Sequence, residues 1–179
     1  MKKVIKVRNI NKTIGKTKIL DNINFDVYEG EIVGIVGKNG AGKSTLLKIM
    51  SGLYFADEGE IYYYDYNLKN DYEKAMSIIG TVIESPDLYK NLTGEENLKV
   101  FKTMFKGIDE NTIKEIVNIL ELEKIIGKKF KTYSLGMKER LALANSLINK
   151  PKILILDEPT NGLDVIGIKK IFNMIKSLK

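Results

Sequence analysis

The 179-residue sequence contains no cysteine and no histidine. The first absence excludes disulfides and cysteine-based metal sites or nucleophiles, and the second excludes imidazole acid–base chemistry and histidine-ligated zinc. No apolar run approaches the roughly 18 residues that cross a bilayer, and the alternating charged and apolar residues at the start lack the apolar core of a signal peptide. We therefore expect a chain without a membrane span, located in the cytoplasm.

Arginine is almost absent as well. Only Arg8 and Arg140 are arginines among the 29 basic residues, although the net charge is +6 and the pI is near 9.2. A basic balance favours nucleic acid or an anionic membrane surface as a partner, but arginine is the side chain that best reads phosphates and bases. The lysines are scattered, and their longest cluster, at 128–131, is typical of a solvated turn. We therefore expect no nucleic-acid partner.

The composition is that of an ordinary globular protein. Hydrophobic residues make up 44% of the chain and charged residues 29%, which excludes disorder as its overall state. The length suits one domain with a sizeable core, and neither repeats nor low-complexity linkers divide the sequence. We expect residues 1–179 to form one domain, with an inserted helical subdomain at about 87–135.

Hydrophobic periodicity predicts several strands of two kinds. Segments 4–7 and 23–28 alternate apolar and polar residues, as half-buried strands of an antiparallel layer do. Segment 32–36 is instead a continuous apolar run bounded by glycine, which is typical of a strand buried on both faces in a parallel sheet. Further strands are predicted at 61–64, 78–83 and 153–156.

Helices are predicted between these strands. Thr93 and Glu96 form the sequence pattern of a capping box, so a helix should follow and run to residue 105. The other helices are predicted at 44–50, 110–126, 139–149 and 166–179. Buried strands that alternate with helices predict an α/β fold with a mainly parallel sheet, to which the N-terminal strands add an antiparallel layer.

A glycine-rich segment between a predicted strand and a predicted helix carries the strongest motif, G-x-x-x-x-G-K-[ST]. Its glycines let backbone N–H groups curl around an anion, the helix N-terminus adds positive charge, and the lysine and serine can reach phosphates and Mg²⁺. A glycine-rich turn without a ligand would not account for that lysine and serine. The predicted phosphate-binding residues are Gly37, Lys38, Asn39, Gly40, Ala41, Gly42, Lys43, Ser44 and Thr45.

Two carboxylates follow the apolar run at 153–156. Ligands bind at the carboxyl ends of strands in open α/β sheets, so Asp157 is predicted to hold Mg²⁺ and Glu158 to orient or deprotonate an attacking water. The alternative for this pair is two solvated carboxylates at a strand end. The phosphate-binding motif elsewhere in the chain favours the catalytic interpretation.

Two further segments add to these motifs, and together they make the sequence resemble the ATP-binding cassette (ABC) ATPases from about residue 4 to its last residue. Ser-Leu-Gly-Met at 134–137 stands at the family's signature motif, and Asn-Gly-Leu-Asp at 161–164 stands at its D-loop. The resemblance implies a P-loop NTPase core, ATP and Mg²⁺ as ligands, and head-to-tail dimers with two ATP molecules between the subunits. Ser134 and Gly136 would then contact the γ-phosphate bound by the partner subunit's Lys43, and Asp164 would act at the dimer seam. Ser134 can also be a simple helix N-cap.

The sequence departs from the family pattern at three positions that point to a subgroup. Glu84 stands where the family usually has a metal-binding glutamine, and Leu135 and Met137 replace a glycine and a glutamine of the signature. A carboxylate at residue 84 can still ligate Mg²⁺. This combination resembles the ABC ATPases that export antimicrobial peptides, in bacitracin-type resistance and in lantibiotic self-immunity.

Family members also carry a histidine that contacts the γ-phosphate on a strand after the D-loop helix, whereas this sequence has none. We therefore expect an ATP-binding domain that is incomplete at its C-terminus and turns over slowly or not at all.

The predicted function is that of an ATP-hydrolysing subunit of a membrane transporter, which exports a peptide antibiotic or drug. It would work with a separate transmembrane permease and a second ATP-binding subunit, at the inner face of the cell membrane. The alternatives are a truncated or regulatory ATP-binding protein without turnover, and a soluble ABC ATPase that acts on the ribosome or DNA.

Overall fold

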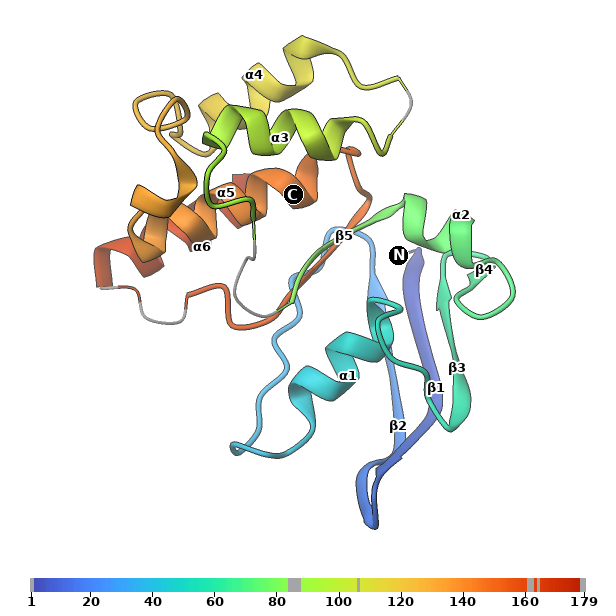
Figure 1. The fold of residues 1–179 in the computed structure, drawn as a ribbon. Helices are drawn as coiled ribbons and strands as arrows, with labels where there is room; N and C mark the ends of the chain where they lie inside the picture. Colours follow the sequence, from blue (N-terminus) through green and yellow to red (C-terminus); the bar gives the residue numbers. More distant parts are fainter. Residues whose placement is uncertain (1, 84–87, 106, 161–162, 164, 178–179) are drawn as a thin grey trace. The chain divides into compact units, whose positions relative to one another are not determined.

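A computed structural model describes residues 2–83, 88–105, 107–160, 163 and 165–177 (Figure 1). The chain divides into two compact units, Met1–Ile79 and Gly80–Lys179. The first unit contains the glycine-rich motif, and the second contains the carboxylate pair and the signature segment. Each unit therefore holds one part of the predicted functional residues.

An antiparallel sheet with strand order β2-β1-β3-β4 forms the framework of the first unit (Figure 1). Its strands are β1 (Lys3–Ile14), β2 (Thr17–Tyr28), β3 (Glu58–Tyr63) and β4 (Tyr66–Asn67). The alternation of apolar and polar residues in β1 places Val7 and Ile10 inside, at 0% and 1% exposure. The predicted antiparallel N-terminal layer is confirmed, and its first two strands are longer than the periodicity indicated.

Helix α1 (Lys43–Met50) contributes the buried side chains of Leu46, Ile49 and Met50 to the core of the first unit. The fully buried Tyr63 donates a hydrogen bond from its hydroxyl to the carbonyl of Met50. Burial strongly raises the pKa of this hydroxyl, which stays protonated and keeps its donor role. The contact fixes the C-terminal end of α1 relative to β3. A short helix that was not predicted from the sequence, α2 (Tyr72–Ser77), follows β4.

The predicted buried strand at 32–36 is wrong. The segment has no strand assignment, and its apolar side chains are exposed, from 37% at Ile35 to 95% at Val36. A continuous apolar run forms a buried strand only when neighbouring strands supply hydrogen-bond partners, and none of the strands in the described residues pairs with it. The run instead leads as an extended connection from β2 into the glycine-rich motif.

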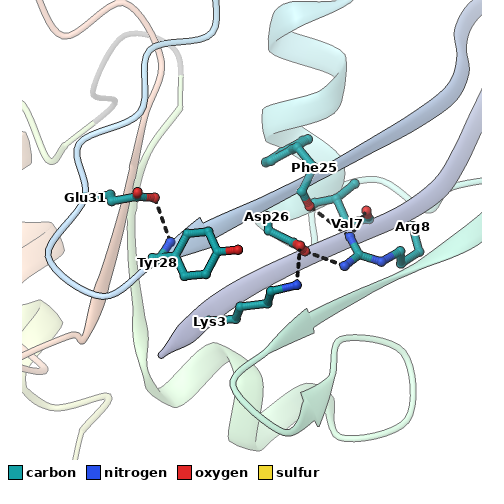
Figure 2. Close-up of polar contacts among 7 residues, drawn as sticks. All are labelled: Lys3, Val7, Arg8, Phe25, Asp26, Tyr28 and Glu31. Carbon is teal, nitrogen blue, oxygen red and sulfur yellow. Dashed lines mark hydrogen bonds and ion pairs between the residues drawn. The ribbon is translucent and has the colours of Figure 1, made fainter. Parts of the chain in front are cut away.

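One acidic side chain links the first two strands of the sheet. Figure 2 shows Lys3 and Arg8, both on β1, reaching Asp26 on β2. The Lys3 Nζ lies 2.6 Å from an Asp26 carboxylate oxygen, and Arg8 also donates to the carbonyls of Val7 and Phe25, at 2.8 and 3.1 Å. Hydrogen bonds from Lys3, and then from Arg8, lower the pKa of Asp26 below its usual value of 3.8.

We expect Asp26→Asn to lower the Tm at neutral pH, by an amount that shrinks as the pH falls through the acidic range. The folded-state pKa of Asp26 lies below the unfolded value, so its stabilising effect is fully present above about pH 4 and is lost as the pH falls through the folded-state pKa. Thermal unfolding followed by circular dichroism across pH 2–7 measures the difference. Asp21→Asn is the matched control on β2, because Asp21 pairs only at the exposed surface with Lys18. Equal Tm losses at all pH values would contradict the ion-pair explanation.

The second unit is mainly helical, with β5 and β6 paired in a two-stranded parallel sheet. Its elements are β5 (Ile79–Val82), α3 (Gly94–Lys102), α4 (Glu110–Ile119), the 3₁₀ turn η1 (Phe130–Thr132), α5 (Leu135–Leu147), β6 (Ile153–Leu156) and α6 (Val165–Ser177). Helices α3 and α4 both contact α5. Leu98, Leu120 and Leu141 are fully buried between them, and Ile171 and Met174 bring α6 into the same core.

Capping explains where these helices begin and end. The capping box of Thr93 and Glu96 is confirmed at the start of α3. The predicted helix at 110–126 ends earlier, at Ile119, because Glu121 adopts the left-handed conformation with φ 51°. The predicted helix at 139–149 begins earlier, at Leu135, because Ser134 caps it.

A buried asparagine holds the segment that precedes α3. Asn97 is 0% exposed, donates to the carbonyls of Tyr89 and Thr93 at 3.1 and 2.9 Å, and accepts from the Tyr89 N–H at 2.8 Å. Its amide is thus satisfied without water, as a buried polar group requires.

Among the described residues, no helix is both long and apolar enough to cross a bilayer.

Candidate functional site

The glycine-rich loop in the first unit closes on its own lysine. The Lys43 Nζ donates to the carbonyl oxygens of Gly37 at 2.9 Å and Lys38 at 3.1 Å, and the Ala41 N–H donates to Lys38 at 3.1 Å. These bonds hold the loop in a curled conformation with the ammonium group inside it. A phosphate that enters the loop would offer this ammonium group stronger, charged acceptors than neutral carbonyls.

Glycine is required at the point where the loop enters α1. Gly42 is the N-cap and has φ 86°, a conformation that side-chain-bearing residues rarely adopt. A Cβ atom there would also lie 2.9 Å from the carbonyl oxygen of Ile19 and 2.9 Å from a methyl group of Leu20, on β2. The backbone of the loop therefore passes against β2 only because this residue has no side chain.

The N-terminus of α1 carries no neutralising group of its own. Gly42 provides no side-chain cap, and no acidic residue lies in the first turn. The N–H groups at the start of a helix lack partners within the helix, and the helix dipole adds positive charge there. Lys43, exposed Ser44 and Thr45 thus place a cation, two hydroxyls and backbone donors together at an anion-binding end.

In the second unit, the carboxylate pair follows β6 in a constrained turn. The Asp157 N–H donates to the carbonyl of Val82 at 2.8 Å, which extends the pairing of β6 with β5 by one bond. Glu158 follows with φ 45°, a conformation that is unfavourable for a residue with a Cβ atom. Asp157 is half-buried and Glu158 is exposed, so the turn presents the second carboxylate outward.

The signature segment forms the N-terminus of α5. The Ser134 hydroxyl accepts from the Met137 N–H at 3.4 Å, so the N-cap role predicted as an alternative for Ser134 is confirmed. A Cβ atom at Gly136 would lie 3.1 Å from a methyl group of Leu163, in the predicted D-loop. Leu135 is 44% exposed.

One side chain that anchors this helix was not predicted from the sequence. Arg140 donates to the carbonyls of Leu120 and Glu121 at 3.3 and 3.0 Å, and its Nε lies 3.4 Å from the carbonyl of Gly136. It therefore ties the first turn of α5 to the end of α4. An arginine four residues after Gly136, on the same helical face, is the sequence signal that could have indicated this role.

Two predicted site residues, Glu84 and Asp164, lie outside the described residues, as do Asn161 and Gly162. Within the described part of the chain, no group of three or more acidic side chains could form a metal cage. Ser44 and Asp157 offer a hydroxyl and a carboxylate, which are hard oxygen ligands of the kind that Mg²⁺ accepts. Each of these groups is of the kind that can bind a magnesium ion whose other ligands are water and phosphate oxygens, which is the usual arrangement at nucleotide sites.

The glycine-rich loop, its lysine and the uncapped N-terminus of α1 define a P-loop nucleotide-binding fold. The chain belongs to the ABC transporter family, whose profile matches residues 20–161. The resemblance identified from the sequence motifs and the predicted fold class are thereby confirmed.

Relatives of known name support this assignment. The lantibiotic transport ATP-binding protein SrtF of Streptococcus pyogenes is 45% identical over 176 residues, which cover 98% of this chain and 75% of SrtF. The bacitracin transport ATP-binding protein BcrA of Enterococcus faecalis is 39% identical over 178 residues, covering 99% and 58%. This chain likewise covers only 58% and 57% of two ABC transporter ATP-binding proteins of Bacillus subtilis, YhcH and YdbJ. The chain thus spans less than two thirds of most of these relatives.

Solved cassettes share the fold. The dimeric, post-hydrolysis structure of the ATP-binding cassette MJ0796, bound to ADP and Pi, superposes with a TM-score of 0.84 at 31% identity. The superposition covers 97% of this chain and 82% of the MJ0796 chain.

Proposed function

We propose that this chain is the ATP-binding part of an ABC exporter, in which it binds Mg-ATP and hydrolyses it to drive export of a peptide antibiotic. The observation that carries the proposal is the P-loop of the first unit, where the Lys43 ammonium group and the uncapped N-terminus of α1 point to a polyphosphate ligand. The relatives SrtF and BcrA, which are named for the transport of a lantibiotic and of bacitracin, support the transported class.

The residues divide the chemistry of hydrolysis between them. The backbone N–H groups of residues 37–45 would hold the phosphates, and Lys43 would exchange its loop carbonyls for β- and γ-phosphate oxygens. Ser44 and Asp157 would hold the magnesium ion, whose charge neutralises phosphate oxygens when it is bound. Glu158 would accept a proton from the water that attacks the γ-phosphorus. The bond from that phosphorus to the bridging oxygen breaks, leaving ADP and inorganic phosphate.

A second ATP-binding subunit completes the proposed assembly. Ser134 and Gly136 would contact the γ-phosphate held by the partner subunit, where the N-terminus of α5 offers N–H groups without an acidic residue in the first turn. Asp164 would lie at the dimer seam, and Glu84 would add a metal ligand. The dimeric MJ0796 cassette supports the two-subunit arrangement.

The membrane-spanning part of the exporter would be a separate permease, since the relatives SrtF and BcrA are named as ATP-binding proteins of transport systems. In this arrangement the chain lies at the inner face of the membrane, where ATP is available. Several lysine side chains of the first unit lie over tyrosine rings of the same chain. These cation–π contacts give the lysines a role that involves no nucleic-acid partner.

We expect Lys43→Ala to weaken Mg-ATP binding by at least about tenfold, because charge-assisted hydrogen bonds to the phosphates are lost. Isothermal titration with Mg-ATP, together with phosphate release, measures binding and turnover in the same preparation. Lys48→Ala is the matched control, since Lys48 lies on the same helix and contacts the ring of Tyr54. Equal affinities of the two variants would contradict the phosphate-binding role. Tight binding without phosphate release in the unmodified chain would instead favour a nucleotide-binding protein without turnover.

A further inference from the structure

One face of α5 contacts the segment that follows β6. Gly136, Glu139 and Leu143 lie three and four residues apart, so they share this face of the helix. A Cβ atom at Gly136 would meet Leu163 at 3.1 Å, as noted above. Further along the helix, an apolar hollow is lined by Val82, Glu139, Leu143, Leu156, Pro159 and Ile171. Glu139 and Leu143 of the signature helix thus line one hollow together with Pro159, which belongs to the turn after β6.

The turn after β6 contains a strained residue between two anchored ends. The Asp157 N–H donates to the carbonyl of Val82 at 2.8 Å, and the Leu163 N–H donates to the carbonyl of Thr160 at 3.2 Å. Glu158 then adopts a left-handed conformation that its own side chain disfavours, and Pro159 follows directly. A strained residue keeps such a conformation only when its surroundings hold it. The side chains that line the hollow are the surroundings of Pro159.

Glu139 is the only ionisable side chain among the six that line this hollow. Strands β5 and β6 carry no ionisable residue. On α5, Lys138 lies over the Phe130 ring and Arg140 is bonded to the end of α4. The charges nearest in the chain to Pro159 are the carboxylates of Asp157 and Glu158. Helix α6 carries Lys169, Lys170 and Lys176, of which Lys169 and Lys176 are exposed.

No ion pair of Glu139 occurs among the described residues, and burial raises the pKa of its carboxyl group. The protonated form therefore suits the apolar hollow better than the ionised form does. A neutral glutamate is compatible with a place in the lining beside Pro159, whereas an ionised one gains by turning toward solvent.

We propose that Glu139 is a positioning residue for Glu158: while its side chain occupies the hollow, it packs α5 against Pro159 and holds the turn that aims the hydrolytic carboxylate. This proposal rests on the proposed function, because it assigns Glu158 to hydrolysis. The signature helix would thereby pack against the turn that carries the hydrolytic residue of its own subunit. It also makes the geometry of the turn sensitive to the protonation of a side chain that does not touch nucleotide.

The test compares the unmodified chain with Glu139→Gln, which keeps the size of the side chain but is always neutral. Backbone amide signals of Asp157 and Glu158, followed by NMR as the pH is raised from below the ordinary carboxyl pKa, should shift with the ionisation of Glu139 in the unmodified chain. That step should be absent in the glutamine variant. In phosphate-release assays, the ratio of kcat for Glu139→Gln to kcat for the unmodified chain should rise by about threefold or more over the same range, with KM unchanged.

Leu143→Ala is the control for a merely structural effect. It enlarges the same hollow and should lower the Tm, but it should retain the Glu139-dependent step in the amide signals. Identical amide titrations in the unmodified chain and Glu139→Gln would overturn the proposal, as would a kcat ratio that stays constant with pH. If the unmodified chain binds Mg-ATP without hydrolysing it, the proposed function fails. The amide titration then decides by itself whether Glu139 holds the turn.

Discussion

Replacing Glu158 by glutamine is expected to lower kcat for ATP hydrolysis by about 10²–10⁴-fold, which is the usual contribution of a general base. The amide cannot accept the proton of the attacking water, whereas the size of the side chain and the turn after β6 are preserved. The affinity for Mg-ATP should change little, because the phosphates are bound by the P-loop and Lys43. Single-turnover phosphate release and equilibrium ATP binding measure the two quantities separately.

Glu115→Gln is the control for this experiment, because Glu115 is an exposed glutamate on the outer face of α4. It should leave both kcat and affinity unchanged. A Glu158→Gln variant that keeps more than about a tenth of the original kcat would show that another group takes the proton. A variant that loses both binding and turnover would instead indicate that the strained turn had collapsed.

The second large effect concerns stability, at the centre of the helical core. Leu141 on α5 is 0% exposed and lies among the buried side chains of α3, α4 and α6. Leu141→Ala should lower the free energy of unfolding by about 2–5 kcal/mol, from lost burial and the cavity that remains. Since domains are stable by only about 5–15 kcal/mol, this loss is a large fraction of the total.

Urea unfolding followed by far-ultraviolet circular dichroism measures this loss, with the Leu135→Ala variant as the matched comparison. Leu135 lies on the same helix but is 44% exposed, so its truncation should cost no more than about 0.5 kcal/mol. Similar losses for the two leucines would mean that α5 does not form the centre of the second unit's core.

Local rules explain why much of the fold could be predicted. The capping box at Thr93 and the antiparallel alternation of β1 and β2 depend on neighbouring residues alone, and both are confirmed. The family could be identified because four motifs occur in one order, and the comparison with known proteins agrees. The roles of Lys43, Asp157, Glu158, Ser134 and Gly136 stay predictions, because no ligand contact tests them.

Where the prediction failed, the outcome depended on strand pairing or on the backbone conformation of a single residue, neither of which apolar periodicity reports. The apolar composition of 32–36 could not show whether neighbouring strands would pair with it, and its side chains are exposed. The early end of α4 at Ile119 depended on the left-handed Glu121, although the apolar spacing continued beyond it. Periodicity measures which residues are apolar, whereas pairing and termination depend on tertiary contacts and on individual backbone conformations.

The P-loop, the order of the motifs and the helix caps could be located from residue patterns, because each needs particular residue types at fixed short spacings. The folded chain was needed to show that Gly42 passes against β2, that Arg140 ties α5 to α4, and that Glu139 lines an apolar hollow beside Pro159. Those contacts join segments many residues apart. The burial and pKa of a side chain follow from the packed surroundings and not from its neighbours in sequence.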